Sequence, residues 1–411
     1  MRWEKSGGTN RVHVTPELVD VTRPDAPTSK WQQPFDAALT GVFQVQSDIA
    51  TKVAQALGGA LAEGEEKRLA EKPTQNLAAY DAFLKGEQAA NGLAATDPPS
   101  LRKALAFYYQ AVALDPNFAQ AWARVSHANS NLYANSVPTP ALAERARQAA
   151  EKAVALAPDR PEGYLALGIY ERLVSLDFNR ALEQFEKGLR VAPADASLPT
   201  GIAQTEQGLG RWDAAVEHFR QAGRLDPRSV GNLRNLGRAL LFLRRYPEAR
   251  EALDRGLALA PANLFMVEYK AMTFLAEGDL PGARAVIKAA PRQVEPTALV
   301  AYLANYNDLV WVLDEEQRDL LLRLTPSAFD DDRTSWAFCV VQAYALKGDE
   351  ARVRTYAEEA RKALEEQLRA APNDPTRRVV LGLALAYLDR KGEAIREGER
   401  GVALDPVSKV R

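Results

Sequence analysis

The sequence predicts a mainly α-helical fold, a right-handed solenoid of about eight or nine helix pairs, preceded by a small α/β segment. The composition favours helices, because the 411 residues are rich in alanine and leucine, with 46% hydrophobic and 26% charged residues. One amphipathic line also recurs along the chain. It reads RWDAAVEHFRQAGRLDP at 211–227, RYPEAREALDRGLALAP at 245–261 and RKGEAIREGERGVALDP at 390–406.

A proline closes each copy of this line, and the interval between these prolines is usually 34 residues. Successive intervals are 42, 35, 34, 34, 30, 81 and 34. Because the residue before a proline is disfavoured in the helical region, each proline is expected to end a helix. The closing prolines are Pro116, Pro158, Pro193, Pro227, Pro261, Pro291, Pro372 and Pro406.

Within each period, small and bulky residues alternate at helical spacing. Examples are Leu167–Gly168 in a first helix and Ala181–Phe185–Gly188 in a second helix. Small residues let two helices approach closely, while a large side chain fills the neighbouring hole. With a period of 34, this pattern resembles the tetratricopeptide repeat, whose motif runs W-x2-L-G-x2-Y, A-x3-F and P. The resemblance covers 77–291 and 335–406 and implies a helical solenoid.

We expect four regions along the chain. A partial α/β segment spans 1–75, six repeats span 76–291, a degenerate repeat spans 292–334, and further repeats span 335–411. Two insertions, NGLAATDPPS (91–100) and NLYANSVPTP (131–140), are expected between the helices of the first two repeats.

The first 75 residues carry a different pattern. RWEK and RVHV flank Gly7–Gly8 and are expected to pair as a hairpin. Apolar residues at three- to four-residue spacing over 42–57 predict an amphipathic helix. The succession RVHVTPELVDV, WQQPFD and VFQVQSDIATKVAQAL resembles the end of a TolB-amino-terminal-like (FlgO-like) domain of bacterial multidomain regulators.

That resemblance covers about 1–90 and lacks the upstream half of the domain, so we expect a piece of a longer protein or a truncated gene. In such proteins the upstream module is commonly a serine/threonine kinase, an adenylate cyclase or a winged-helix domain. None of their motifs occurs in this chain.

Charge and residue usage argue against several function classes. The net charge is −2, from 52 basic and 54 acidic residues, which favours neither nucleic acid nor anionic lipid. With one cysteine and three scattered histidines, no metal site or cofactor is expected. No phosphate loop or hydrolase motif occurs, so we expect no enzyme activity. Without a signal or a spanning segment, a cytoplasmic location is expected, or an extracytoplasmic one if the chain belongs to a membrane-anchored protein.

Two features allow two interpretations each. Asp330, Asp331 and Asp332 could form a cation site or a solvated loop beside a helix start, and their consecutive spacing favours the loop. Cys339 could be a redox sensor or a buried filler at a small-residue position, and the position favours the filler.

The resemblance places a peptide-binding groove along the first helices. Three arginines and several amides there could hold a carboxylate or an acidic peptide, or they could be ordinary solvated residues. The predicted function is a non-catalytic scaffold for a protein or peptide partner in bacterial signalling. Alternatives are the regulatory arm of a kinase or adenylate cyclase encoded upstream, or a homo-oligomer formed through an uncapped C-terminal face. The groove residues are His127, Asn131, Arg172, Gln204, Gln207, Arg234, Asn235, Arg238 and Tyr269.

Overall fold

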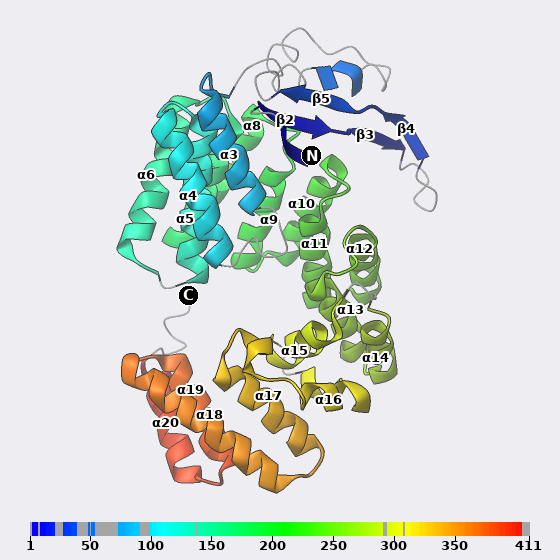
Figure 1. The fold of residues 1–411 in the computed structure, drawn as a ribbon, viewed down its shortest axis with the longest axis vertical. Coiled ribbons are helices and arrows are strands. Elements are labelled where there is room, and N and C mark those ends of the chain that lie inside the picture. The colour runs from blue at the N-terminus through cyan, green and yellow to red at the C-terminus, as the bar shows by residue number, and fades with distance from the viewer. Residues whose placement is uncertain are drawn as a thin grey trace. The chain divides into compact units, whose positions relative to one another are not determined.

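The computed structural model describes residues 2–6, 9–20, 28–38, 48–49, 51–53, 73–90, 98–136, 138–290, 294–306 and 309–404. The chain divides into two compact units, Met1–Leu225 and Asp226–Arg411. Figure 1 shows the helices and strands of both units, which are described separately below.

The first unit begins with two small antiparallel sheets. The predicted hairpin is confirmed, since β1 pairs with β2 in a register that sets Trp3 opposite Val12. β2 also pairs with β5, and β3 pairs with β4. The stretch 11–20 forms two strands separated at Pro16, which cannot donate a ladder hydrogen bond. The strands are β1 (Arg2–Ser6), β2 (Thr9–Val14), β3 (Glu17–Asp20), β4 (Thr28–Gln32) and β5 (Phe35–Ala38).

Only part of the helix predicted over 42–57 can be compared with the structure. Residues 48–49 and 51–53 are helical, and the remainder lies outside the described residues.

Four helix pairs follow in the first unit, each helix packing on its partner. In the third pair, helix α7 continues into a π-helical turn. The backbone of Leu176, directly after this turn, has the left-handed conformation, with φ of 56°. The pairs are α3 (Leu77–Ala90) with α4 (Pro98–Leu114), α5 (Ala119–Asn135) with α6 (Pro140–Leu156), α7 (Pro161–Tyr170) and its π turn η2 (Glu171–Ser175) with α8 (Phe178–Val191), and α9 (Ser197–Gly208) with α10 (Trp212–Leu225).

In the second pair, the insertion expected at 131–140 is wrong, because most of these residues belong to the two helices. Helix α5 continues to Asn135, and Thr139 then caps α6, accepting a hydrogen bond from the backbone N–H of Leu142. Pro140 occupies the first turn of α6, where its missing N–H costs nothing. The interval of 42 residues therefore reflects two helices of 17 residues each, joined by a short connection.

The pairing of large and small residues expected from the repeat is present in the core. The Phe185 ring is fully buried and packs with Ile169, Leu198 and Ile202. A Cβ added at Gly168 or Gly201 would overlap this ring. These glycines therefore let α7 and α9 approach the ring on α8.

The second unit contains further pairs and one irregular segment. Regular pairs are α11 (Val230–Phe242) with α12 (Tyr246–Leu259), α13 (Leu264–Ala276) with α14 (Leu280–Lys288), α17 (Arg333–Leu346) with α18 (Glu350–Ala370), and α19 (Pro375–Tyr387) with α20 (Lys391–Leu404). Between them lie α15 (Pro296–Tyr306), η3 (Leu309–Trp311), α16 (Glu315–Leu321) and η4 (Pro326–Phe329). The fold is thus a helical repeat solenoid, as the sequence predicts.

The irregular segment and the following helix contain two features that the sequence analysis singles out. Asp330 and Asp331 are exposed and left-handed, while Asp332 caps α17 through the N–H of Thr334 at 2.9 Å. Among the described residues no cluster of three metal-ligating side chains occurs. Cys339 is 2% exposed and belongs to the core formed with α13, α14 and α15.

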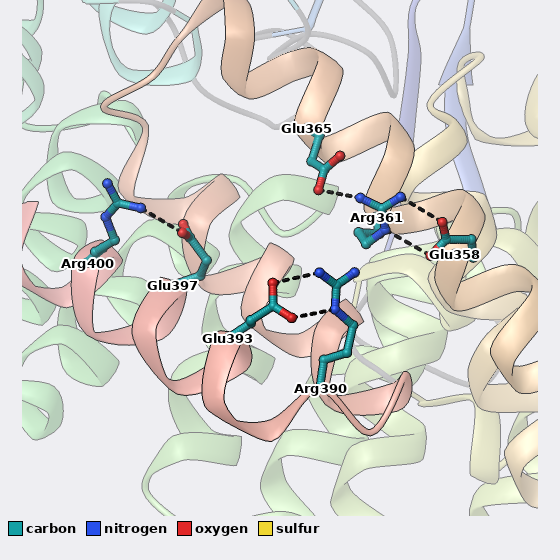
Figure 2. A network of polar contacts seen from close by, with 7 residues as sticks. All are labelled: Glu358, Arg361, Glu365, Arg390, Glu393, Glu397 and Arg400. Carbon is teal, nitrogen blue, oxygen red and sulfur yellow. Dashed lines mark hydrogen bonds and ion pairs between the residues drawn. The ribbon is translucent and has the colours of Figure 1, made fainter.

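Helices α18 and α20 carry a charged surface of short-range ion pairs (Figure 2). Arg361 donates to both oxygens of Glu358 and to Glu365, all on α18. Arg390 and Glu393 make a bidentate pair at the start of α20. One pair crosses between helices, since Arg378 of α19 donates to Glu397 of α20 at 2.7 Å.

Candidate functional site

In the first unit the predicted groove residues lie on successive first helices. α5 packs on α7, and α7 packs on α9. Every one of these side chains is half-buried. The Asn131 amide donates to the backbone oxygen of His127, so part of its capacity serves its own helix. The five residues are His127 and Asn131 on α5, Arg172 on η2, and Gln204 and Gln207 on α9.

A network missed by the sequence analysis lies beside His127. Glu87 of α3 accepts a bidentate pair from Arg124 of α5, at 2.8 and 3.0 Å, and a 2.6 Å hydrogen bond from the Tyr108 hydroxyl. Burial, with a smaller contribution from Glu87, raises the pKa of Tyr108. The Arg124 guanidinium is thus already neutralised by an acid of its own chain.

His127 is neutral at physiological pH. Burial, together with the smaller effects of the nearby charges of Arg124 and Arg172, lowers its pKa to about 3. The structure therefore brings His127 and Arg172 into electrostatic range of each other. A neutral imidazole can donate or accept a hydrogen bond but contributes no positive charge.

In the second unit Arg234 and Arg238 lie one turn apart on α11 and point to a common region. Burial lowers the pKa of Arg234, and the like charge of Arg238 lowers it further. Within the described part of the chain, Arg234 makes no ion pair; its guanidinium carbon instead lies 5.5 Å from the centroid of the Phe265 ring. A half-buried cation over an aromatic ring retains most of its capacity to bind an anion.

Aromatic and acidic residues complete this surface. Tyr269 of α13 has a pKa raised by burial, although the charge of Arg238 and its hydrogen bond to Tyr269 oppose the shift. Phe265, one turn earlier on α13, is 39% exposed. Its ring packs edge-on against the ring of Tyr302 on α15, with 5.5 Å between the two ring centroids. The Tyr302 hydroxyl donates to the buried carboxylate of Glu268. We call Arg234, Arg238, Phe265, Tyr269 and Tyr302 the α11–α15 surface.

One predicted groove residue of this unit lies elsewhere. Asn235 is 7% exposed, because it belongs with Asn232, Leu236 and Ala239 to the buried side of α11. Phe265 was missed, although its position four residues before Tyr269 places it on the same face of α13.

Comparisons with known proteins agree with the repeat. Residues 207–267 match the family model described as the tetratricopeptide repeat. The small glutamine-rich tetratricopeptide repeat-containing protein 2 of Mycosarcoma maydis is 30% identical over 87 residues, which are 21% of this chain and 25% of that protein. The protein named "Putative adenylate cyclase 3" of Rhizobium meliloti (strain 1021) is 28% identical over 179 residues, which are 43% of this chain and 29% of that protein. The chain thus spans well under a third of the length of either relative.

A solved structure, the human IFIT1 dimer with PPP-AAAA, is similar with a TM-score of 0.48 and 13% identity, covering 88% of this chain and 78% of that one. No described helix has both the length and the hydrophobicity that crossing a membrane requires. The family match and the stacked helix pairs together support a helical solenoid of the tetratricopeptide type.

Proposed function

We propose that this chain is a non-catalytic scaffold that binds an acidic segment of a partner protein along its first helices. The observation that carries the proposal is Arg234, a half-buried guanidinium that makes no ion pair with any described residue. Removing a cation from water without an acid partner is unfavourable, so such a group favours an incoming anion.

The rest of the α11–α15 surface fits a peptide carboxylate. Arg234 supplies a planar pair of donors for bidentate binding, and Arg238 adds positive charge one turn away. Phe265 offers an exposed ring on which an apolar side chain beside the carboxylate can pack. The ligand is therefore a short acidic segment containing at least one apolar residue.

The test is the affinity of the chain for an array of acidic peptides of about twelve residues. The double variant Arg234→Gln/Arg238→Gln is expected to bind the tightest peptide about tenfold or more weakly than the unaltered chain, because two charge-assisted contacts are lost. Arg255→Gln/Lys288→Gln, which removes the same charge from exposed positions of the same unit, is the matched control and is expected to change the affinity less than about twofold. Equal affinities of the two double variants would refute the proposal.

A second candidate function is the regulatory arm of an adenylate cyclase or a serine/threonine kinase. The 28% identity to a relative named as an adenylate cyclase favours it, as does the TolB-like pattern of the N-terminal segment. We place such a protein in bacterial signalling, with this chain in the cytoplasm. Sequencing the DNA upstream of Met1 tests this version, which a stop codon close above Met1 would contradict.

A third candidate is self-association through the last helix pair. Val379 and Leu383 of α19 and Ile395 and Val402 of α20 are each about half exposed. In α8 the corresponding Leu182 and Leu189 pack into the core with α9. Sedimentation at tens of micromolar tests this version, and a monomer there would count against it.

A further inference from the structure

An open hollow of about 580 Å³ lies in the first unit between α4, α5 and α6, apart from every predicted groove residue. Its size lies within the range of about 300–1,000 Å³ found for binding pockets. Helix α5 contributes Trp122 and Val125, α4 contributes Tyr109, and α6 contributes Arg145, Gln148 and Lys152.

The α4 and α5 sides of the hollow are aromatic and apolar. Val125 is 1% exposed, and the half-buried Trp122 ring is held in place by a 2.9 Å hydrogen bond from its Nε1 to the backbone oxygen of Pro116. Such a surface favours one bulky apolar side chain.

The Tyr109 hydroxyl adds a hydrogen-bond donor to this surface. Asn129 Nδ2 donates both to the Val125 carbonyl at 2.8 Å and to the Tyr109 oxygen at 3.2 Å. Because the carbonyl can only accept, the amide orientation is fixed, and Tyr109 acts as acceptor toward Asn129. Its own O–H is therefore available to an acceptor in the hollow.

The α6 side is basic. Arg145 and Lys152 are seven residues apart, with Gln148 between them, so all three share one face of the helix. Both cations are exposed, and neither makes an ion pair with a described residue; Arg145 Nε donates to the backbone oxygen of Ala141.

Among the described residues, neither the α4 side nor the α5 side of the hollow supplies a carboxylate. Helices α4 and α5 contain no aspartate or glutamate, and α4 adds Arg102 and Lys103. The only acids of α6 are Glu144 and Glu151, and Arg147 pairs with both of them. Gln148 also donates to Glu144. Both acids of α6 are therefore engaged by Arg147 of their own helix, while Arg145 and Lys152 face the hollow.

From this arrangement we propose that the hollow is a second docking site, which takes an acidic segment of a partner protein with one bulky apolar side chain on the Trp122 ring. Carboxylates before and after that side chain pair with Arg145 and Lys152, about 10 Å apart along α6 at 1.5 Å per residue. The site uses no residue of the α11–α15 surface, so either site can fail without the other.

A protein segment fits better than a nucleic acid. A single strand would find rings for stacking, but it would also need a continuous basic track for its phosphates. Glu144 and Glu151 adjoin Arg145 and Lys152 on α6 and interrupt such a track. A peptide segment with one carboxylate on each side of an apolar residue matches the spacing of Arg145 and Lys152 better than a row of phosphates does.

The test measures fluorescence anisotropy of the full chain with labelled acidic peptides of about twelve residues that differ only at the central position. We expect tryptophan or leucine at the centre to bind, and serine there to weaken binding about fivefold or more. Arg145→Gln/Lys152→Gln is expected to weaken binding about tenfold, and replacing the peptide glutamates by glutamine should have a similar effect.

The matched control is Lys187→Gln/Arg190→Gln, which removes two exposed cations from α8 of the same unit. The affinity of this control variant for the peptides should stay within about twofold of that of the unaltered chain. The proposal is overturned if no peptide of the series depends on Arg145 and Lys152 more than on the control pair. It is also overturned if an oligouridylate binds more tightly than the peptides and competes with them.

Discussion

Gly201 and Phe185 provide a direct test of the packing that builds the array. The Phe185 ring is fully buried between glycines of the helices on either side, Gly168 on α7 and Gly201 on α9. In Gly201→Ala, the new methyl group would lie 2.7 Å from Cε1 and 2.8 Å from Cζ of the ring. Carbon atoms in contact prefer about 3.5–4.0 Å, so the ring or α9 must shift by about 1 Å.

The expected energies follow from two opposing effects. Overpacking of this kind costs about 1–3 kcal/mol, while alanine in a helix is favoured over glycine by about 1 kcal/mol. We therefore expect Gly201→Ala to lower the free energy of unfolding by up to about 2 kcal/mol. Phe185→Ala should cost about 3–5 kcal/mol, and in that background Gly201→Ala should become stabilising, because no ring opposes the methyl group.

Urea denaturation followed by circular dichroism measures these changes, and hydrogen exchange of α7–α9 localises them to the first unit. Gly398→Ala is the control, because an added Cβ there meets no atom within 4 Å, and it should stabilise its helix by up to about 1 kcal/mol. The reasoning is refuted if Gly201→Ala costs the same with and without the Phe185 ring, or if it stabilises the unaltered chain.

Three further predictions concern charged groups. Glu87→Gln should lower the unfolding free energy by about 1–3 kcal/mol, because Arg124 and Tyr108 lose a charged acceptor, whereas Glu144→Gln on the surface should change it little in the same urea titration. His127, whose pKa burial lowers to about 3, should show no NMR titration between pH 5 and pH 8, and an apparent pKa near its usual value would contradict the structure. Since the unfolded histidine binds a proton below about pH 6.5, stability should fall as the pH drops from 6.5 toward 3, and His127→Gln should remove part of that loss. Arg361→Gln should cost less than about 1 kcal/mol, because its ion pairs lie within one surface helix, and the difference should vanish in about 1 M salt; an unchanged cost in salt would point to packing instead.

The regular part of the fold could be predicted because its determinants are local. Ala181, Phe185 and Gly188 each repeat a contact made within one helix pair, so a periodic pattern predicts them without knowledge of distant residues. The extent of α5 could not be predicted this way. NLYAN has no helix-ending proline, and the polar residues there were interpreted as a loop although they continue a helix. The π turn at 171–175 likewise has no proline or glycine to indicate it.

The candidate site was predictable in part, for a related reason. Arg234, Arg238 and Tyr269 follow from their spacing within the repeat, whose first helices are expected to line the groove, and they lie close together on α11 and α13. Asn235 has the same spacing argument but turns toward the buried side, a difference of one position on the helix. Tyr302 comes from the degenerate repeat, where the period of 34 no longer indicates which residue meets which.

Two groups of arginines in this chain differ in their charge pairing and in their roles. Arg147, Arg245, Arg361 and Arg390 lie in or beside second helices and bind glutamates three or four residues away. Such pairs form as each helix forms, so these arginines need no partner protein and leave no unpaired positive charge on the surface. Arg234 and Arg145 make no ion pair with a described residue, although the chain has more acidic than basic residues. In a nearly neutral chain, the sequence of each helix decides which cations have no acidic side chain to pair with. These cations indicate where binding an acidic partner is most favourable.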